Sequence, residues 1–170
     1  MTAYVALLRA VNVGGTGKLP MAELVRICEA MCFTGVRTYI ASGNTVFASQ
    51  TAEARVKAQL EQAVHAHAGK PIGVLVRNAS EMAEVLANNP FFDEARNRTL
   101  AIFLDEAPPS DTLSTLSGQK DEVVRLGRRE IYARYGDGMG TSTLKIPAAK
   151  IGTARNMNTI AKLAAMAAEI

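Results

Sequence analysis

A glycine-rich segment near the amino terminus is the first place where the sequence offers chemistry. It runs from Asn12 to Lys18 and carries three glycines, as phosphate-binding loops between a strand and a helix do. A true P-loop would have glycine in place of Asn12 and serine or threonine in place of Leu19, so the hydroxyl that holds Mg²⁺ is missing. Two interpretations follow: a flexible turn, or a nest of backbone N–H groups for an anion with Lys18 at its rim.

A polar motif near the carboxyl terminus offers a second anion site. Four polar residues crowd the start of a predicted helix: Arg155, Asn156, Asn158 and Thr159. The free N–H groups and positive dipole end of a helix favour an anion, which Arg155 would grip with two hydrogen bonds. The alternative is structural, with Asn156 or Asn158 capping the helix and Arg155 paired with a carboxylate.

The distribution of charge links these two motifs. The chain of 170 residues has a formal net charge of +3 and a pI of about 9.0. Three windows, residues 1–22, 30–52 and 138–168, contain no acidic residue and together carry +7. If folding brings the windows together, they form one positive surface suited to a phosphate or carboxylate group. The alternative is that the bases solvate separate faces, as charged residues usually do.

Metal binding and nucleophilic catalysis have weaker support. Cys28 and Cys32 are four residues apart on one predicted helix. A zinc site would need the two histidines of the chain, His65 and His67, to converge on them, so we predict no metal site. Ser42 lies in a predicted hairpin, but the sequence identifies no base to activate it. Whether the protein is an enzyme therefore stays open, and no cofactor is identified.

Composition excludes several classes of protein. Hydrophobic residues make up 48% of the chain and charged residues 21%, and no apolar run approaches the ~20 residues of a membrane span. The amino terminus lacks a secretory signal, so we expect a cytoplasmic protein without membrane contact. The chain has no Trp and lacks the basic and paired aromatic pattern of RNA-binding strands. Weak nucleic-acid binding therefore stays only as an alternative.

The elements predicted in the first half follow the order β-α-β-β-α-β. Apolar residues recur every three or four positions in the two helices, whereas the strands are short runs of β-branched and apolar residues. Gly43 followed by Asn44 is typical of a tight hairpin turn. In order, we expect a strand at 4–9, a helix from Pro20 to about 33, strands at 36–41 and 45–48, a helix at 52–68 and a strand at 72–76.

The second half is predicted to repeat part of this plan. We expect a helix at about 80–88, a strand at 100–104, a short helix opening at 108–111, a hairpin of strands 123–126 and 131–135, and a final helix from Asn158. The hairpin glycines Gly43 and Gly127 are 84 residues apart, which suggests duplication. The match fails at the end, because the sequence predicts a capped helix from Asn158 where strict repetition would demand a strand.

The fold class that follows is α+β. We predict two ferredoxin-like (βαββαβ-type) subdomains, residues 1–78 and 79–170, sharing a core and followed by a carboxyl-terminal helix. The oligomeric state and the pathway cannot be predicted from the sequence.

Three ordered motifs resemble one bacterial family across essentially the whole chain. They are LLRAVNVGG at residues 7–15, YIASGNTVF at 39–47 and TARNMNT at 153–159, with Asn89-Pro90-Phe91 between the last two. This pattern resembles the family called domain of unknown function 1697, which often has Gly in place of Ala10 and Trp in place of Met157. The resemblance implies two ferredoxin-like subdomains and no established reaction.

Together these observations favour binding of a small anionic, phosphorylated ligand at a basic site rich in glycine and asparagine. The alternatives are a protein-interaction module without chemistry of its own and a weak nucleic-acid binder. The residues predicted to bind the ligand are Arg9, Asn12, Gly14, Gly15, Lys18, Ser42, Gly43, Asn44, Arg155, Asn156 and Asn158.

Overall fold

The protein folds into two compact units, seen here in a computed structural model that describes residues 1–12 and 18–170. Unit 1 comprises Met1–Ala83 together with Lys162–Ile170, and unit 2 comprises Glu84–Ala161. One boundary therefore falls inside α3 (Ala79–Ala87) and the other inside α4 (Met157–Ala168). Each unit is described below by itself.

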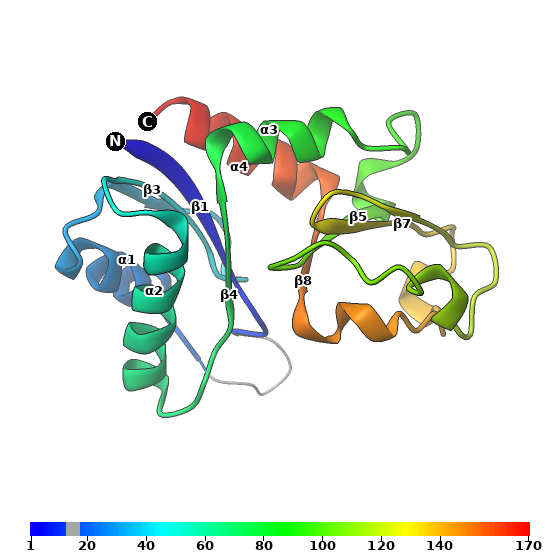
Figure 1. Cartoon of the computed structure of the whole chain (residues 1–170), viewed down its shortest axis with the longest axis horizontal. Helices are drawn as coiled ribbons and strands as arrows, with labels where there is room; N and C mark the ends of the chain where they lie inside the picture. The colour runs from blue at the N-terminus through cyan, green and yellow to red at the C-terminus, as the bar shows by residue number, and fades with distance from the viewer. Residues whose placement is uncertain (13–17) are drawn as a thin grey trace. The chain divides into compact units, whose positions relative to one another are not determined.

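Unit 1 is built on a four-stranded antiparallel sheet, here called sheet A, with the strand order β2-β3-β1-β4. Helices α1 and α2 lie together beside these strands (Figure 1), and their side chains join those of one sheet face in a single core. The elements of this unit that precede α3 are β1 (Thr2–Leu8), α1 (Met21–Ala30), β2 (Thr34–Thr38), β3 (Asn44–Ser49), α2 (Glu53–Ala68) and β4 (Val74–Asn78).

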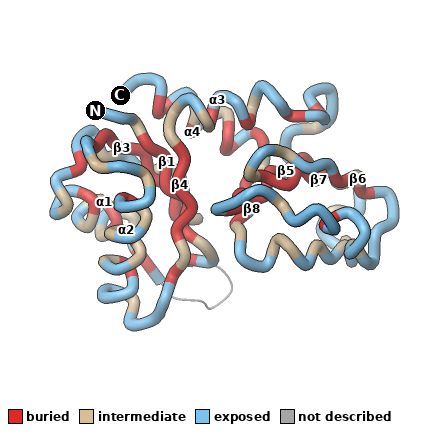
Figure 2. Tube along the Cα trace, viewed as in Figure 1, coloured by how far each residue is buried: buried red, intermediate tan, exposed pale blue. Residues whose placement is uncertain are grey.

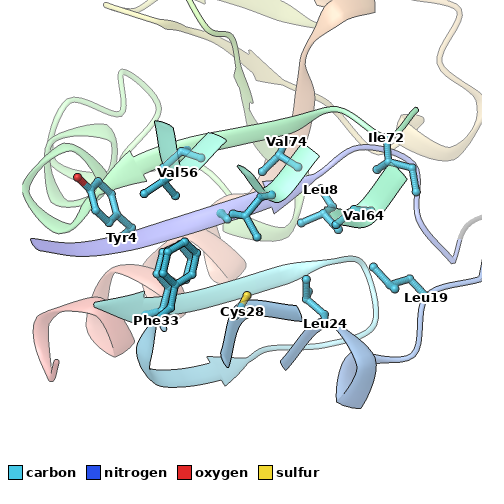
Figure 3. Packing of buried hydrophobic residues seen from close by; sticks show 14 of the residues in the cluster. Tyr4, Leu8, Leu19, Leu24, Cys28, Phe33, Val56, Val64, Ile72 and Val74 are labelled. Atoms are coloured by element: carbon cyan, nitrogen blue, oxygen red, sulfur yellow. The ribbon is translucent and has the colours of Figure 1, made fainter. Parts of the chain in front are cut away.

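The core of unit 1 follows from the periodicities of its sequence. Alternate residues of β1, among them Tyr4 and Leu8, point to the helices, as a period of two requires. Leu24 and Cys28 of α1 meet them from a helix whose apolar residues are four apart (Figure 3). The ring of Phe33 stacks on Phe47 with 4.4 Å between centroids. This core holds the sheet end at which β1 stops and β3 starts.

The second face of sheet A is buried as well. Val5 and Leu7, which alternate with the helix-facing residues of β1, have no exposed surface, and β1 and β4 are buried along much of their length (Figure 2). Within unit 1, the end of α4 lies beside β2, because the Arg37 guanidinium donates to the carbonyl of Met166 at 3.0 Å and to the Glu169 carboxylate at 3.1 Å.

Unit 2 has the same strand order in a second antiparallel sheet, here called sheet B: β6-β7-β5-β8. Its connections are short 3₁₀ turns where unit 1 has α1 and α2. The elements are η1 (Arg96–Arg98), β5 (Thr99–Phe103), η2 (Leu113–Thr115), β6 (Val123–Leu126), β7 (Glu130–Arg134), η3 (Met139–Thr141), η4 (Pro147–Ile151) and β8 (Thr153–Asn156), followed by α4.

All four strands of sheet A have a counterpart in sheet B, so the expectation that the repeat fails at the chain's end was wrong. The strand demanded by repetition is β8, which runs only from Thr153 to Asn156 and passes directly into α4. It escaped prediction because its residues are polar, and its strand character comes from pairing with β5. The prediction of an α+β fold with two ferredoxin-like halves is confirmed.

Three local predictions were also wrong. The helix expected from 108–111 is only a 3₁₀ turn at Leu113–Thr115, where side-chain hydroxyls occupy the backbone carbonyls of the preceding turn. Asn44 is the first residue of β3 and not a turn residue. Cys32 lies beyond the end of α1 with φ at 62°, so it does not share a helix face with Cys28. No helix in the described part of the chain has the length and apolar character that a membrane crossing requires.

Candidate functional site

Those predicted binding residues of unit 1 that the structure describes meet at one end of sheet A, which we call the β1 junction (residues 8–12, 18–20, 39–44 and 72–73). The Leu8 N–H donates to the carbonyl of Gly43 at 2.9 Å, and the Arg9 N–H donates to the carbonyl of Gly73 at 2.9 Å. Gly43 must be glycine here. Its φ is 88°, and a Cβ would lie 2.6 Å from Val11 and 2.9 Å from Leu8.

Asn12 ties the two ends of the glycine-rich segment together. Its side-chain amide donates to the carbonyl of Leu19 and to that of Ala41, each at 2.8 Å. Its side-chain oxygen accepts the Leu19 N–H at 2.8 Å. These bonds use both amide hydrogens of Asn12. The side chain therefore fixes the entry and exit of the loop and joins them to the β2–β3 connection.

The side chains of Asn44 and Ser42 form hydrogen bonds within the β2–β3 connection. Asn44 is fully buried, and its amide donates to the carbonyl of Tyr39 and to the hydroxyl of Ser42, each at 2.9 Å. The Tyr39 N–H in turn donates to the carbonyl of Asn44 at 3.1 Å. The five-residue loop between β2 and β3 (residues 39–43) is thereby closed around the buried side-chain amide of Asn44.

The backbone of the β1 junction is strained. Four described non-glycine residues of the chain have positive φ, and three of them lie here: Ala10 (50°), Asn12 (57°) and Ile40 (50°). Asparagine tolerates this left-handed region, whereas a β-branched residue such as Ile40 is a marked outlier. Strained backbone gathers at binding and catalytic sites because the surrounding structure must hold it.

The side chains of the junction bring positive charge and no negative charge. Lys18 is exposed, and Arg9 lies over Gly73, whose Cβ position is 3.0 Å from the Arg9 Cδ. A third cation, Lys70, lies outside the junction, three residues before Gly73 in the segment that enters β4. No acidic residue occurs in the segments that form the junction. Such a surface attracts anions.

The carboxyl-terminal motif belongs to unit 2, at the passage from β8 to α4. Arg155 is buried, and its guanidinium donates to the Thr153 hydroxyl at 2.7 Å and to the carbonyl of Ala154 at 2.9 Å. Burial lowers the pKa of Arg155 to about 10. Asn156 caps α4 by accepting the Thr159 N–H at 2.9 Å, and Asn158 is exposed in the first turn.

The structure thus brings six of the predicted residues together within unit 1. Gly14 and Gly15 lie outside the described residues. Arg155, Asn156 and Asn158 lie in the other unit from the β1 junction. The six that gather at the junction are Arg9, Asn12, Lys18, Ser42, Gly43 and Asn44.

Sequence reasoning missed two features of the junction. Ile40 was assigned to a strand because β-branched residues favour strands, and its left-handed backbone has no local signal. Gly73 is predicted inside the strand at 72–76, whereas β4 begins at Val74. Only the pairing of β1 with β4 sets Gly73 against Arg9. Both features depend on contacts between segments distant in the sequence.

The cysteines do not form a site with the histidines. Cys28 is buried, and burial raises the pKa of its thiol to about 12, so it stays protonated at neutral pH. The Nδ1 of His67 is 3.8 Å from Oε1 of the Glu23 carboxylate. In residues 1–12 and 18–170, no group of three or more His, Cys, Asp or Glu side chains is placed to hold a metal ion.

Comparison with known proteins places the chain in a family without giving it a reaction. The chain resembles the solved structure of a conserved bacterial protein, SP0830, from Streptococcus pneumoniae, with a TM-score of 0.80 and 26% sequence identity over 98% of each chain. No curated protein matches the sequence significantly. The family described as Protein of unknown function (DUF1697) matches residues 1–132, which include the whole β1 junction. With most of its length matched, the chain belongs to the DUF1697 family.

Proposed function

We propose that the β1 junction of unit 1 binds a small anionic ligand carrying a phosphate group. The observation that carries this proposal is a strained, hydrogen-bonded backbone at a place where the described charged side chains are all positive. Arg9 and Lys18 would neutralise the anion. Ser42 would offer a hydroxyl at the same sheet end.

Lys18 is the cation best placed to meet a ligand. It is exposed, and no hydrogen bond or ion pair within the described residues engages its ammonium group. Its neighbour Leu19 is buried and bonded twice to Asn12, so the backbone that carries Lys18 is fixed. A charge on a fixed backbone loses less conformational entropy when it binds.

The size of the positive surface favours a small ligand over a long polyanion. The net charge of the chain is only +3, and extended duplex binding needs many phosphate contacts. A single phosphate or diphosphate group is matched by two or three cations. The proposal is confined to unit 1 because Arg155 and Asn156 already make intramolecular hydrogen bonds.

A thermal-shift series with phosphate, pyrophosphate, sugar phosphates and nucleotides tests the proposal. A ligand at about 100 times its Kd stabilises a protein by about 2.7 kcal/mol, roughly 5–10 °C in Tm for this length. We expect at least one phosphorylated compound to raise Tm by that order in the wild type, and the Lys18→Gln variant to lose most of the rise.

The matched control is Arg55→Gln, which removes one exposed positive charge elsewhere in unit 1. Arg55 lies in the first turn of α2, about 20 Å along that helix from the end that leads to Gly73. Its response should equal that of the wild type. Equal responses in both variants, or no response to any phosphorylated compound, would contradict the proposal. Heparin, a long polyanion, is added to the series as a stand-in for nucleic acid. A rise in Tm with heparin and with no small phosphorylated compound would favour the nucleic-acid alternative.

A further inference from the structure

A pocket lies within unit 2, at the end of sheet B where β5 starts and β7 stops. Its volume is about 280 Å³, just below the usual range of about 300–1,000 Å³ for ligand pockets. Several separate segments form its walls, so its shape depends on the fold. Its lining residues include Glu94, Arg98, Asp121, Arg134, Gly136 and Asp137.

Arg134 supplies a hydrogen-bond donor that the protein does not use. Its Nε is buried and has no hydrogen-bond partner. The nearest carboxylate oxygen paired with it, Oε1 of Glu94, is 3.9 Å away, which is too far for a hydrogen bond. A buried N–H without an acceptor is destabilising, so an acceptor brought by a ligand or water would be favoured there.

Asp121 supplies the complementary acceptor. Its carboxylate packs directly on the backbone of Gly136, where a Cβ would lie 1.9 Å from Oδ2. Any other residue at position 136 would displace this carboxylate. Asp121 is exposed, and no hydrogen bond or ion pair within the described residues engages its side chain. The glycine therefore keeps an open carboxylate at the pocket wall.

The remaining charges decide what kind of ligand fits. Arg98 and Asp137 form an ion pair with each other, and the Tyr135 N–H fixes the backbone of Arg98 at 2.8 Å. Two arginines against three carboxylates leave the lining with a formal charge of −1. A simple anion would meet net repulsion, and a simple cation would leave the Arg134 donor unsatisfied.

We propose that this pocket binds a small zwitterion of amino-acid size. The ammonium group of the ligand contacts the Asp121 carboxylate, and the carboxylate of the ligand accepts the Arg134 N–H. The pocket volume suits one such molecule. This site is separate in the sequence from the β1 junction, so its existence does not depend on anion binding there.

Titration calorimetry of the full chain with the proteinogenic amino acids tests this inference. Acetate and methylammonium, each with one of the two charges, serve as control compounds. We expect at least one amino acid to bind saturably and neither control compound to bind. Asp121→Asn and Arg134→Gln should each weaken that binding at least tenfold, and Gly136→Ala should weaken it by displacing Asp121.

The matched control variant is Asp111→Asn, an exposed aspartate of unit 2 outside the pocket lining. It should bind as the wild type does, and circular dichroism should show all variants folded. The inference is overturned if no amino acid binds, if Asp121→Asn binds normally, or if acetate alone binds as well as the amino acid. Binding of acetate as strong as that of the amino acid would mean that the pocket is an anion site. No binding of any amino acid would mean that only water satisfies Arg134.

Discussion

The same junction occurs in both halves of this duplicated protein, and the two copies differ in charge. In unit 1, the Leu8 N–H at the end of β1 donates to the carbonyl of Gly43 at 2.9 Å. In unit 2, the Leu104 N–H after β5 donates to the carbonyl of Arg129 at 2.9 Å. The charged residues of the unit 1 copy are all basic, whereas the unit 2 copy has both acidic and basic residues in 104–106 and 127–130.

The two copies also differ in backbone conformation. Ala10, Asn12, Ile40 and Gly43 all have positive φ in unit 1. In unit 2, no residue of 104–106 or 127–130 does, and a hydrogen bond from the Gly127 N–H to the Glu130 carbonyl at 2.7 Å closes the turn. The fold can therefore make this junction without strain. Strain that the fold does not need supports a binding role for the unit 1 copy.

A second feature is the same in both halves. Arg77 in β4 and Arg155 in β8 are both buried, and each donates to the carbonyl of the residue before it, at 3.0 and 2.9 Å. The asparagine that follows each arginine caps the next helix, Asn78 through Glu81 and Asn156 through Thr159. Repetition in both copies favours a structural role for this Arg-Asn pair.

The largest effect should come from the two arginines. Arg77→Ala and Arg155→Ala each remove a buried, hydrogen-bonded guanidinium, so each should lower the free energy of unfolding by about 3–5 kcal/mol. Urea denaturation measures both. Arg77→Met and Arg155→Met, which keep most of the side-chain volume, should lose less.

This experiment can break the comparison between the copies. A structural role predicts losses of similar size for Arg77 and Arg155. It also predicts that Arg155→Met keeps the thermal response to pyrophosphate or whichever phosphorylated compound stabilises the wild type. If Arg155→Met kept its stability and lost that response, the carboxyl-terminal motif would belong to the binding site after all.

Much of the architecture could be predicted because it depends on local patterns. The helix around Leu24 and Cys28 has apolar residues four apart, and the strands around Val5 and Val46 are apolar and β-branched. These patterns are contained in short stretches of sequence. They also predicted a loop at Asn12 and a hairpin at Asn44, two segments that the structure brings together.

The missed parts depend on distant contacts. Thr153 and Arg155 form a strand only because β5 offers a free edge to pair with. Ile40 is left-handed because its neighbours Tyr39 and Ala41 are held through their carbonyls by Asn44 and Asn12. No window of sequence around these residues contains that information. Local propensity therefore fails most at the junction and at the last strand.

Asn44→Ala should have the next largest effect. In unit 1, the buried amide of Asn44 closes the connection together with the backbone hydrogen bond between Tyr39 and Asn44, whereas in unit 2 the Gly127–Glu130 backbone hydrogen bond closes the turn. Its loss leaves the Tyr39 carbonyl without that donor, so we expect a loss of about 2 kcal/mol in urea denaturation. Asn97→Ala, at an exposed asparagine of unit 2, should change the stability by less than about 0.5 kcal/mol. Similar values for both variants would mean that side chains do not hold the unit 1 junction.

Ile40→Asn should have the smallest effect, and with the opposite sign. Asparagine tolerates the left-handed backbone better than isoleucine, and Ile40 is 51% exposed, so little burial is lost. We expect a gain of about 0.5–1 kcal/mol by urea denaturation. Ile151→Asn, at a 70% exposed position without positive φ, should give no gain. Because asparagine would relax a backbone held for the ligand, the variant should also lose part of the thermal response to phosphorylated compounds. A variant that is more stable and responds fully would separate the strain from binding, and the contrast between the two junctions would then rest on charge alone.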